Sequence, residues 1–162
     1  MTNQKKVPAS DERKRNSKRR YCTKKRAPKK AVSLPPVEQE KVRISFLGGM
    51  NEIGKNMTLY EYKNDMFIVD CGLAFPTAEL PGVDLVIPDF TYVINNQDRI
   101  RGIIVTHGHE DHIGGLAYLL KKVNIPVYAT KLTIGLIKGK LEEHGLLNKV
   151  KLVEIKPRDN IT

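Results

Sequence analysis

The sequence predicts a mixed α/β fold of the α+β type, in which helices pack on the outer face of a sheet. Three short apolar segments come first, and an alternation of strand-like with helix-like segments begins only after residue 100. Strands followed by strand–helix alternation are typical of such a sheet. Residues 42–162, roughly 120 in number, are enough to enclose a modest hydrophobic core.

The expected elements follow the hydrophobic pattern in order. Short runs rich in β-branched and aromatic residues predict strands, and apolar residues at helical spacing predict helices. A long Pro- and Gly-punctuated loop from Leu73 to Pro88 interrupts this pattern. We expect strands at 42–47, 56–62, 66–70, 101–106, 126–129 and 149–155, and helices at 112–123 and 131–143.

Charge divides the chain into two parts. The first thirty residues carry thirteen Lys or Arg against Asp11 and Glu12, a net charge of +11, whereas the remaining residues have a net charge of −1. The leader lacks apolar periodicity, so we expect residues 1–40 to be a disordered basic extension and residues 41–162 to be the folded domain. Such an extension could hold RNA through phosphate contacts, or be a solvated tail without a partner.

The cysteines and the apolar segments exclude several classes of protein. Cys22 and Cys71 are the only cysteines, which supports neither a disulfide framework nor a Cys-type zinc finger. We expect Cys71 to be a small, semi-buried residue. No segment approaches the length of a membrane span, and no apolar core of a secretory signal follows the basic leader. These features fit a cytoplasmic protein.

The segment His107-Gly108-His109-Glu110-Asp111-His112 places three of the four histidines and a carboxylate within six residues. Alternate side chains of an extended strand face the same way, so His107 and His109 leave the strand end on one side. Helix entry then turns Asp111 and His112 toward a second point. The segment thus offers two ligand pairs to two adjacent metal ions. The alternative is a polar loop in which Asp111 caps a helix.

Imidazole and carboxylate ligands without thiolate suit zinc, with manganese or iron as alternatives. A catalytic zinc lowers the pKa of its bound water to about 7, and two ions can clamp both oxygens of a displacement at phosphorus. Each ion here needs at least one further protein ligand. The fourth histidine, His144, is expected near the end of a helix, where the helix dipole favours it, and not as a ligand.

The glycine-rich segment Gly49-x-x-x-x-Gly54-Lys55 comes close to a phosphate-binding loop. Such a loop needs Ser or Thr after the lysine and a helix behind it. Here Asn56 follows the lysine, and the next residues predict a strand. A hairpin connection between two strands is therefore the better interpretation.

Two of these segments resemble motifs of the metallo-β-lactamase superfamily. Residues 106–112 are similar to its second motif, and Asp70-Cys71-Gly72 after a strand is similar to its first. The resemblance implies that His107 and His109 hold one metal ion and that Asp111 and His112 hold the other. Asp111 would also orient the attacking hydroxide, and Asp70 would orient the metal loop without touching the ions. A turn at the strand end is the alternative for Asp70.

Other segments resemble the ribonuclease J family of β-CASP RNA nucleases, and the similarity extends from about Val42 to Thr162. The resemblance implies the N-terminal half of a four-layer αββα sandwich, two zinc ions per complete site, and RNA as substrate. It also implies 5′-to-3′ exonuclease and endonuclease action in RNA processing and decay, homo-oligomers, and partners in an RNA-degradation complex. The segments that carry it are residues 46–56, 75–76, 82–84, 87–90 and 141–145.

By the same resemblance, the remaining metal ligands, the β-CASP insertion and the C-terminal domain are not in these residues, so we expect a truncated, inactive fragment. Two other functions stay open. One is a hydrolase of the same fold that acts on a thioester or a lactam. Such an enzyme has no use for a basic tail or an RNA channel, so an assay of salt-dependent RNA affinity separates it from a ribonuclease. The other is a non-catalytic RNA-binding module, whose RNA affinity would survive chelation.

Overall fold

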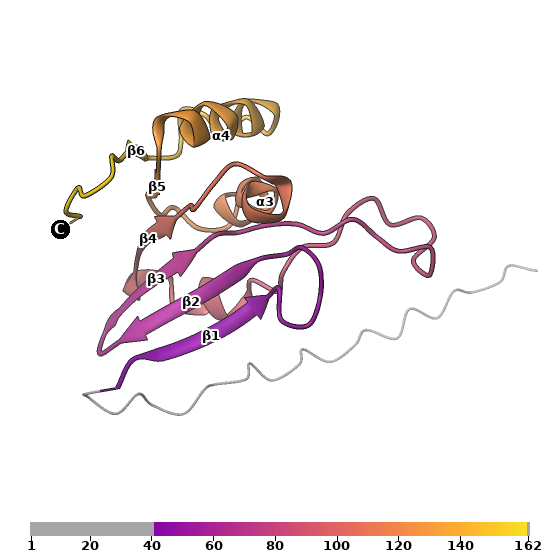
Figure 1. The fold of residues 1–162 in the computed structure, drawn as a ribbon, viewed down its shortest axis with the longest axis horizontal. Helices are drawn as coiled ribbons and strands as arrows, with labels where there is room; N and C mark the ends of the chain where they lie inside the picture. The colour runs from indigo at the N-terminus through magenta and orange to yellow at the C-terminus, as the bar shows by residue number, and fades with distance from the viewer. Residues whose placement is uncertain (1–40, 162) are drawn as a thin grey trace, which may run out of the picture. The chain divides into compact units, whose positions relative to one another are not determined.

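The computed structural model describes residues 41–161, and its frame is a six-stranded sheet in the order β1-β2-β3-β4-β5-β6 (Figure 1). The expected disordered extension and Cys22 lie outside the described residues. The strands are β1 (Arg43–Gly48), β2 (Met57–Tyr62), β3 (Asp65–Val69), β4 (Ile100–Ile104), β5 (Val127–Ala129) and β6 (Leu152–Glu154). The helices are α1 (Thr91–Asn95), the 3-10 turn η1 (Gln97–Arg99), α2 (Glu110–Ile113), α3 (Leu116–Leu120) and α4 (Lys131–Glu143).

The strands pair in two ways. The first three form antiparallel hairpins, and β3, β4, β5 and β6 run parallel to one another. Val69 pairs with Ile104, so the carboxyl ends of β3 and β4 are neighbours. Asp70, directly after β3, and Thr106, two residues after β4, therefore meet at one edge of the sheet.

The core lies on one face of the sheet, between the strands and the helices. Alternation along the strands places one cross-strand row of side chains in this core, and the helices add Val93, Leu119 and Ile137. All members of the row are fully or almost fully buried: Leu59, Ile68, Ile103 and Val127. The expected mixed α/β fold, with helices on the sheet, is confirmed.

One charged group is buried at the side of this core. Glu61 of β2 is 3% exposed and forms ion pairs with Arg99 and Arg43. The Tyr92 hydroxyl donates to Glu61 Oε2, the oxygen that also faces Arg43, at 3.3 Å. Partial burial and the Glu61 charge raise the pKa of Tyr92. This network ties β2 to α1 and η1, and it satisfies a carboxylate that would otherwise be costly to bury.

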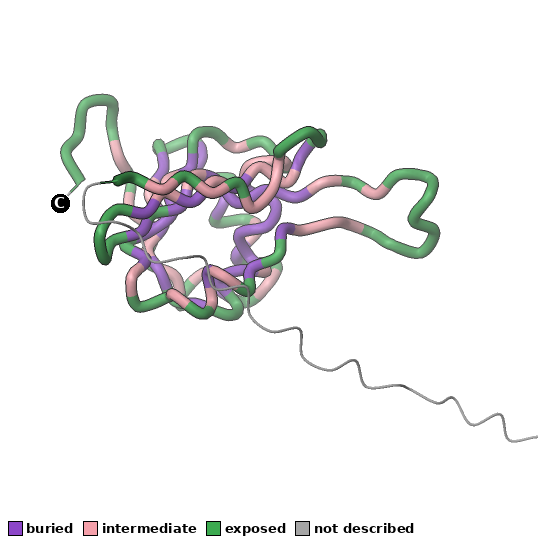
Figure 2. The backbone as a smooth tube through the Cα atoms, turned by 90° about the horizontal axis from the view of Figure 1, so that it is seen from below, coloured by how far each residue is buried: buried purple, intermediate pink, exposed green. Residues whose placement is uncertain are grey.

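The other face of the sheet carries the next cross-strand row. Tyr60 pairs with Phe67, and Phe67 pairs with Gly102. The Tyr60 and Phe67 rings stack at 4.9 Å, yet Phe67 remains 40% exposed and Phe46 of β1 55% exposed. No described helix covers this face. Figure 2 shows that the segment between β3 and α1 extends as an exposed arm.

The helix expected over 112–123 is wrong as a single helix, because it is divided into α2 and α3. In a continuous helix the Asp111 carbonyl would accept a hydrogen bond from the Gly115 N–H. Instead, the Asp111 carbonyl accepts from the Asn56 N–H at 3.0 Å, and the Gly115 N–H donates to the Cys71 carbonyl at 2.8 Å. Hydrogen bonds to other segments therefore replace those of the helix.

Other expected bounds differ less. The helix over 131–143 is confirmed, whereas β4 ends at Ile104 and β6 is shorter than expected. The sequence pattern did not predict α1 or η1. Helix α1 has only five residues, too few to display a helical period, and the Asp89 carboxylate accepts from the Thr91 N–H at its start.

No helix within residues 41–161 combines the length and the hydropathy that a membrane span needs.

Candidate metal centre

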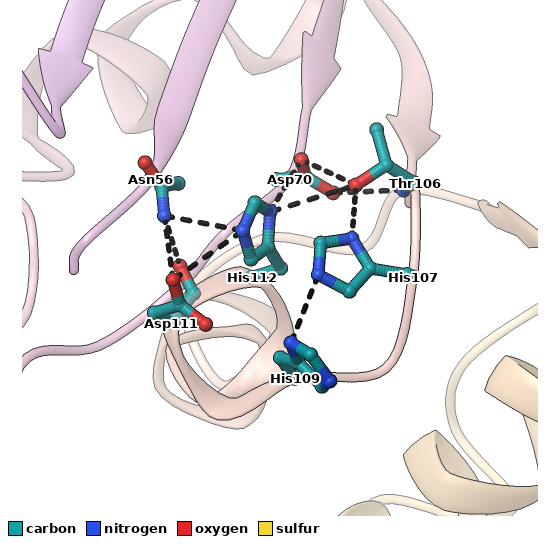
Figure 3. Close-up of polar contacts among 7 residues, drawn as sticks. All are labelled: Asn56, Asp70, Thr106, His107, His109, Asp111 and His112. Carbon is teal, nitrogen blue, oxygen red and sulfur yellow. Dashed lines mark hydrogen bonds and ion pairs between the residues drawn. The ribbon is translucent and has the colours of Figure 1, made fainter.

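Asp70 anchors the candidate site from the end of β3. It is 5% exposed and has a φ of +60°, a left-handed conformation that Asp adopts more readily than most residues. Its carboxylate accepts hydrogen bonds from the Thr106 N–H at 2.8 Å and from the Thr106 hydroxyl (Figure 3). His112 Nδ1 lies 2.9 Å from Asp70 Oδ2. Asp70 thus joins the end of β3 to both ends of the histidine segment.

These contacts determine which nitrogen of each ring is free. The Asp70 carboxylate only accepts, so His112 Nδ1 donates to it, and Nε2 is the ring nitrogen left for another partner. The Thr106 hydroxyl donates its one proton to Asp70 and accepts from His107 Nδ1, which lies 3.0 Å away. In this ring too, Nε2 is the nitrogen left for another partner, and it faces His109. Both rings present the nitrogen that a metal ion requires.

The two ligand pairs of the sequence are brought together. His107 Nε2 lies 3.2 Å from His109 Nδ1, and His112 Nε2 lies 3.4 Å from Asp111 Oδ2. Two ligands at 2.0–2.1 Å from one tetrahedral zinc ion are separated by about 3.3 Å. Each pair therefore fits two ligands of a single ion. The His107 and His112 rings lie side by side, with centroids 4.0 Å apart, so the two positions are adjacent.

Each pair supplies only part of a coordination shell. Within residues 41–161, no three His, Cys, Asp or Glu side chains converge on one point as a metal site would require. Asp111 lies in the first turn of α2, and His109 occupies the position before the helix without a capping side-chain bond. The interpretation of Asp111 as the helix cap is therefore wrong.

The segment after β3 holds the histidine segment in place through backbone contacts. The Cys71 N–H donates to the His112 carbonyl at 2.8 Å, and the Leu73 N–H donates to the Glu110 carbonyl at 3.1 Å. Gly72 lies between them, and a Cβ atom there would be 1.6 Å from the Asp111 carbonyl oxygen. Only glycine allows the two backbones to approach this closely.

A family model for the metallo-β-lactamase superfamily matches residues 50–160. The chain belongs to this superfamily. The match includes Asp70 and the whole histidine segment, and the expectation drawn from these two motifs is confirmed at the level of the superfamily.

The chain is also similar to curated ribonuclease J proteins, and it spans about a fifth to a quarter of their length. Ribonuclease J 1 of Streptococcus pyogenes is 48% identical over 131 residues, which are 81% of this chain and 23% of that protein. Ribonuclease J2 of Bacillus subtilis is 49% identical over 123 residues, 76% of this chain and 22% of that protein. Ribonuclease J of Thermus thermophilus is 49% identical over 129 residues, with the same two shares.

The sequence also gave expectations for Cys71 and His144. The expectation that Cys71 is semi-buried is wrong, because the residue is fully buried. Burial, together with the nearby Asp70 charge, raises the pKa of its thiol. His144 lies directly after α4, at the helix end where it was expected. Its Nδ1 is 2.9 Å from Lys121 Nζ, and its ring packs against the Tyr118 ring.

Sequence reasoning missed Asn56 as part of the site. In the sequence, Asn56 broke the resemblance to a phosphate-binding loop and ended one segment of the ribonuclease J resemblance, and neither observation assigned it to the site. In the structure its side-chain nitrogen lies 3.0 Å from Asp111 Oδ2 and 3.3 Å from His112 Nε2 (Figure 3). No local signal could have identified this contact, because Asn56 is 55 residues away from Asp111 in the chain.

Proposed function

We propose that this chain carries metal-binding residues of a ribonuclease that hydrolyses phosphodiester bonds in RNA. The observation that carries the proposal is the 48% identity with Ribonuclease J 1 over 81% of the chain. The placement of the site supports it, because His107 and Asp70 follow the carboxyl ends of neighbouring parallel strands. This end of a parallel sheet is where α/β proteins bind their ligands.

In this proposal, His107 and His109 bind one metal ion, and Asp111 and His112 bind a second. Zinc fits best, since the donors are imidazole and carboxylate with separations of 3.2 Å and 3.4 Å, and manganese is the alternative. Two such ions, when bound, ionise a water molecule and stabilise the charge that develops at phosphorus.

The protein groups orient what the site binds. Asp70 holds His112, and Thr106 holds His107, so that both rings direct Nε2 toward the ligand pairs. Asp111 accepts a hydrogen bond from the attacking water and thereby sets its direction. The Asp70 carboxylate acts through His112 and Thr106, so it is a positioning residue.

The cleavage assay uses the gene product that contains this chain, with labelled single-stranded RNA. Replacing His109 by Ala should lower the cleavage rate about 100-fold or more, since metal-ion catalysis is worth several kcal/mol. Chelation should have the same effect, and added Zn²⁺ or Mn²⁺ should reverse it.

His144→Ala is the matched control, because this histidine lies at the end of α4 and contacts Lys121 and Tyr118 instead of the ligand pairs. Its cleavage rate should equal that of the wild type. Cleavage that persists in metal-free protein would contradict the proposal. Hydrolysis of a thioester or a β-lactam, with RNA left intact, would contradict it too.

The isolated 162-residue chain is proposed to bind metal weakly and to turn over little RNA. Each described ligand pair provides two of the four ligands that a tetrahedral zinc ion takes. Robust RNA cleavage by purified residues 1–162, abolished in His107→Ala, would contradict this part of the proposal.

A further inference from the structure

Asn56 lies at the junction of three segments around the candidate site. Its N–H donates to the Asp111 carbonyl at 3.0 Å, and its own carbonyl accepts from the Gly72 N–H at 3.0 Å. The residue directly precedes β2, so its backbone is held by the sheet on one side and by the loop after β3 on the other. These two backbone hydrogen bonds therefore fix the position of the Asn56 backbone from which the side chain extends.

The side-chain amide faces the second ligand pair (Figure 3). Asn56 Nδ2 lies 3.1 Å from the Asp111 carbonyl oxygen, 3.0 Å from Asp111 Oδ2 and 3.3 Å from His112 Nε2. The first two of these atoms only accept hydrogen bonds. The amide nitrogen, and not the amide oxygen, must therefore be on this side, because an oxygen here would face acceptors only.

This assignment has a consequence for His112. An amide NH₂ group only donates, so Asn56 faces His112 Nε2 as a donor at 3.3 Å, and Asp111 Oδ2 lies 3.4 Å from the same nitrogen. Asp70 accepts from His112 Nδ1 on the opposite side of the ring. The two side chains, one directly before β2 and the other directly after β3, thus contact the ring on opposite sides, with Nε2 facing Asp111.

Resting on the proposed function, the geometry points to Asn56 as a positioning residue of the second metal position. It holds the Asp111 carboxylate beside His112 Nε2, at the separation that two ligands of one ion would have. The pair is thereby preorganised for a divalent cation, and neither side chain has to be reoriented when the ion binds. Groups that orient metal ligands in this way typically contribute 10- to 100-fold to metal affinity.

The test is a titration of the protein with Zn²⁺ by calorimetry, comparing the wild type with Asn56→Ala. Asp111→Ala and His109→Ala identify which binding event belongs to which ligand pair. We expect Asn56→Ala to weaken the event that Asp111→Ala abolishes by about 10-fold or more, and to leave the event that His109→Ala abolishes unchanged. With Co²⁺ as the probe, only the absorption bands of the Asp111–His112 position should change.

Asn96→Ala is the matched control. Its side-chain amide also donates to a backbone carbonyl, that of Tyr92 at 2.8 Å, but it lies at the end of α1. Zinc affinity equal to that of the wild type is expected for this control. If Asn56→Ala does not fold, as judged by circular dichroism, Asn56→Ser carries the same expectation, since its hydroxyl is too short to reach the carboxylate.

Three results would overturn the inference: unchanged zinc affinity in the Asn56 variant, an equal loss in Asn96→Ala, or tighter binding. Tighter binding would show that the amide competes with the cation. Because the readout is metal binding, the inference can fail while RNA cleavage remains. It can equally hold in a protein that cleaves no RNA.

Discussion

At the residue scale, hydrogen bonds from behind orient the ligand histidines. Thr106 and Asp70 occupy the Nδ1 atoms of His107 and His112, at 3.0 Å and 2.9 Å. Each ring is then held in one orientation, with Nε2 facing its ligand pair. The left-handed φ of Asp70 fits this role, because backbone strain in folded proteins gathers at functional sites.

Thr106→Val tests this arrangement, since it keeps the shape of the side chain and removes the hydroxyl. We expect zinc affinity to fall about 10-fold or more. The free energy of unfolding should fall by about 1–3 kcal/mol, because the buried Asp70 carboxylate loses a donor. Calorimetry and urea unfolding measure the two effects. Thr133→Val is the control. The Thr133 hydroxyl, in α4, is also buried, and it lies 3.2 Å from the Thr130 hydroxyl, away from the ligand pairs. Its loss should leave zinc affinity unchanged.

A second prediction at this scale concerns the Cys71 thiol. Burial, reinforced by the Asp70 charge, raises its pKa, so the reactive thiolate is scarce at neutral and mildly alkaline pH. In a Cys22→Ser variant, which leaves Cys71 as the only thiol of this chain, a thiol reagent at pH 8 should react slowly with native protein and rapidly in urea. Fast labelling of the native variant would show that the site opens readily.

At the element scale, the candidate site is built from strand ends and loops and not from one helix. The loop after β3 forms hydrogen bonds with the start of α2, and these contacts divide the expected helix into α2 and α3. As a result, Asp111 and His112 lie on a short helical turn that is bonded to its neighbours through the backbone. The ligand segment therefore depends on how closely the two backbones approach.

Gly72→Ala tests the close approach. The added methyl group would overlap the Asp111 carbonyl, so the two segments must separate. We expect a loss of about 1–3 kcal/mol or more in the free energy of unfolding, together with weaker zinc binding.

Gly139→Ala is the control at this scale. Nothing lies within 4 Å of a Cβ atom at Gly139, and the residue is in α4. Alanine there should stabilise the protein by up to about 1 kcal/mol, because glycine is a poor helix former. A Gly72→Ala protein as stable as the wild type would contradict the packing described here.

At the scale of the whole described domain, the sheet is covered by helices on one face only. The other face carries exposed aromatic and aliphatic side chains, among them Ile44 at 50% and Phe46 at 55% exposure. It also contains a hollow of about 440 Å³ lined by Phe67, Ile104 and Tyr128, together with Arg101, Gly102 and Ile161. Contiguous apolar surface of this kind drives association in water.

We therefore predict that the purified 162-residue chain binds a hydrophobic fluorescent dye and self-associates. The double variant Ile44→Lys and Phe46→Lys should reduce both effects, with little change in stability because both side chains are half exposed. Leu132→Lys, at a 77% exposed position on α4, is the control and should change neither. Dye fluorescence and sedimentation velocity give the readouts.

Much of the fold and of the candidate site could be predicted from local pattern. The α4 helix follows from its own apolar spacing, and the ligand pairs follow from histidines and an aspartate only one to two residues apart. Short α1 gave no periodic signal. The break between α2 and α3 could not be predicted, because the competing donor belongs to Asn56 and the competing acceptor to Cys71, both far away in the chain.

What the sequence by itself determined is the type of most elements, the family motif and the identity of the candidate ligands. These depend on residues close together in the chain. The tertiary structure decided which nitrogen His112 presents to the site, because Asp70 contacts its Nδ1 across 42 residues of sequence. It also decided that Asn56 belongs to the site and that one sheet face stays uncovered in the described residues. Hydrogen bonds and burial between distant segments have no local signature, so they appear only once the chain is folded.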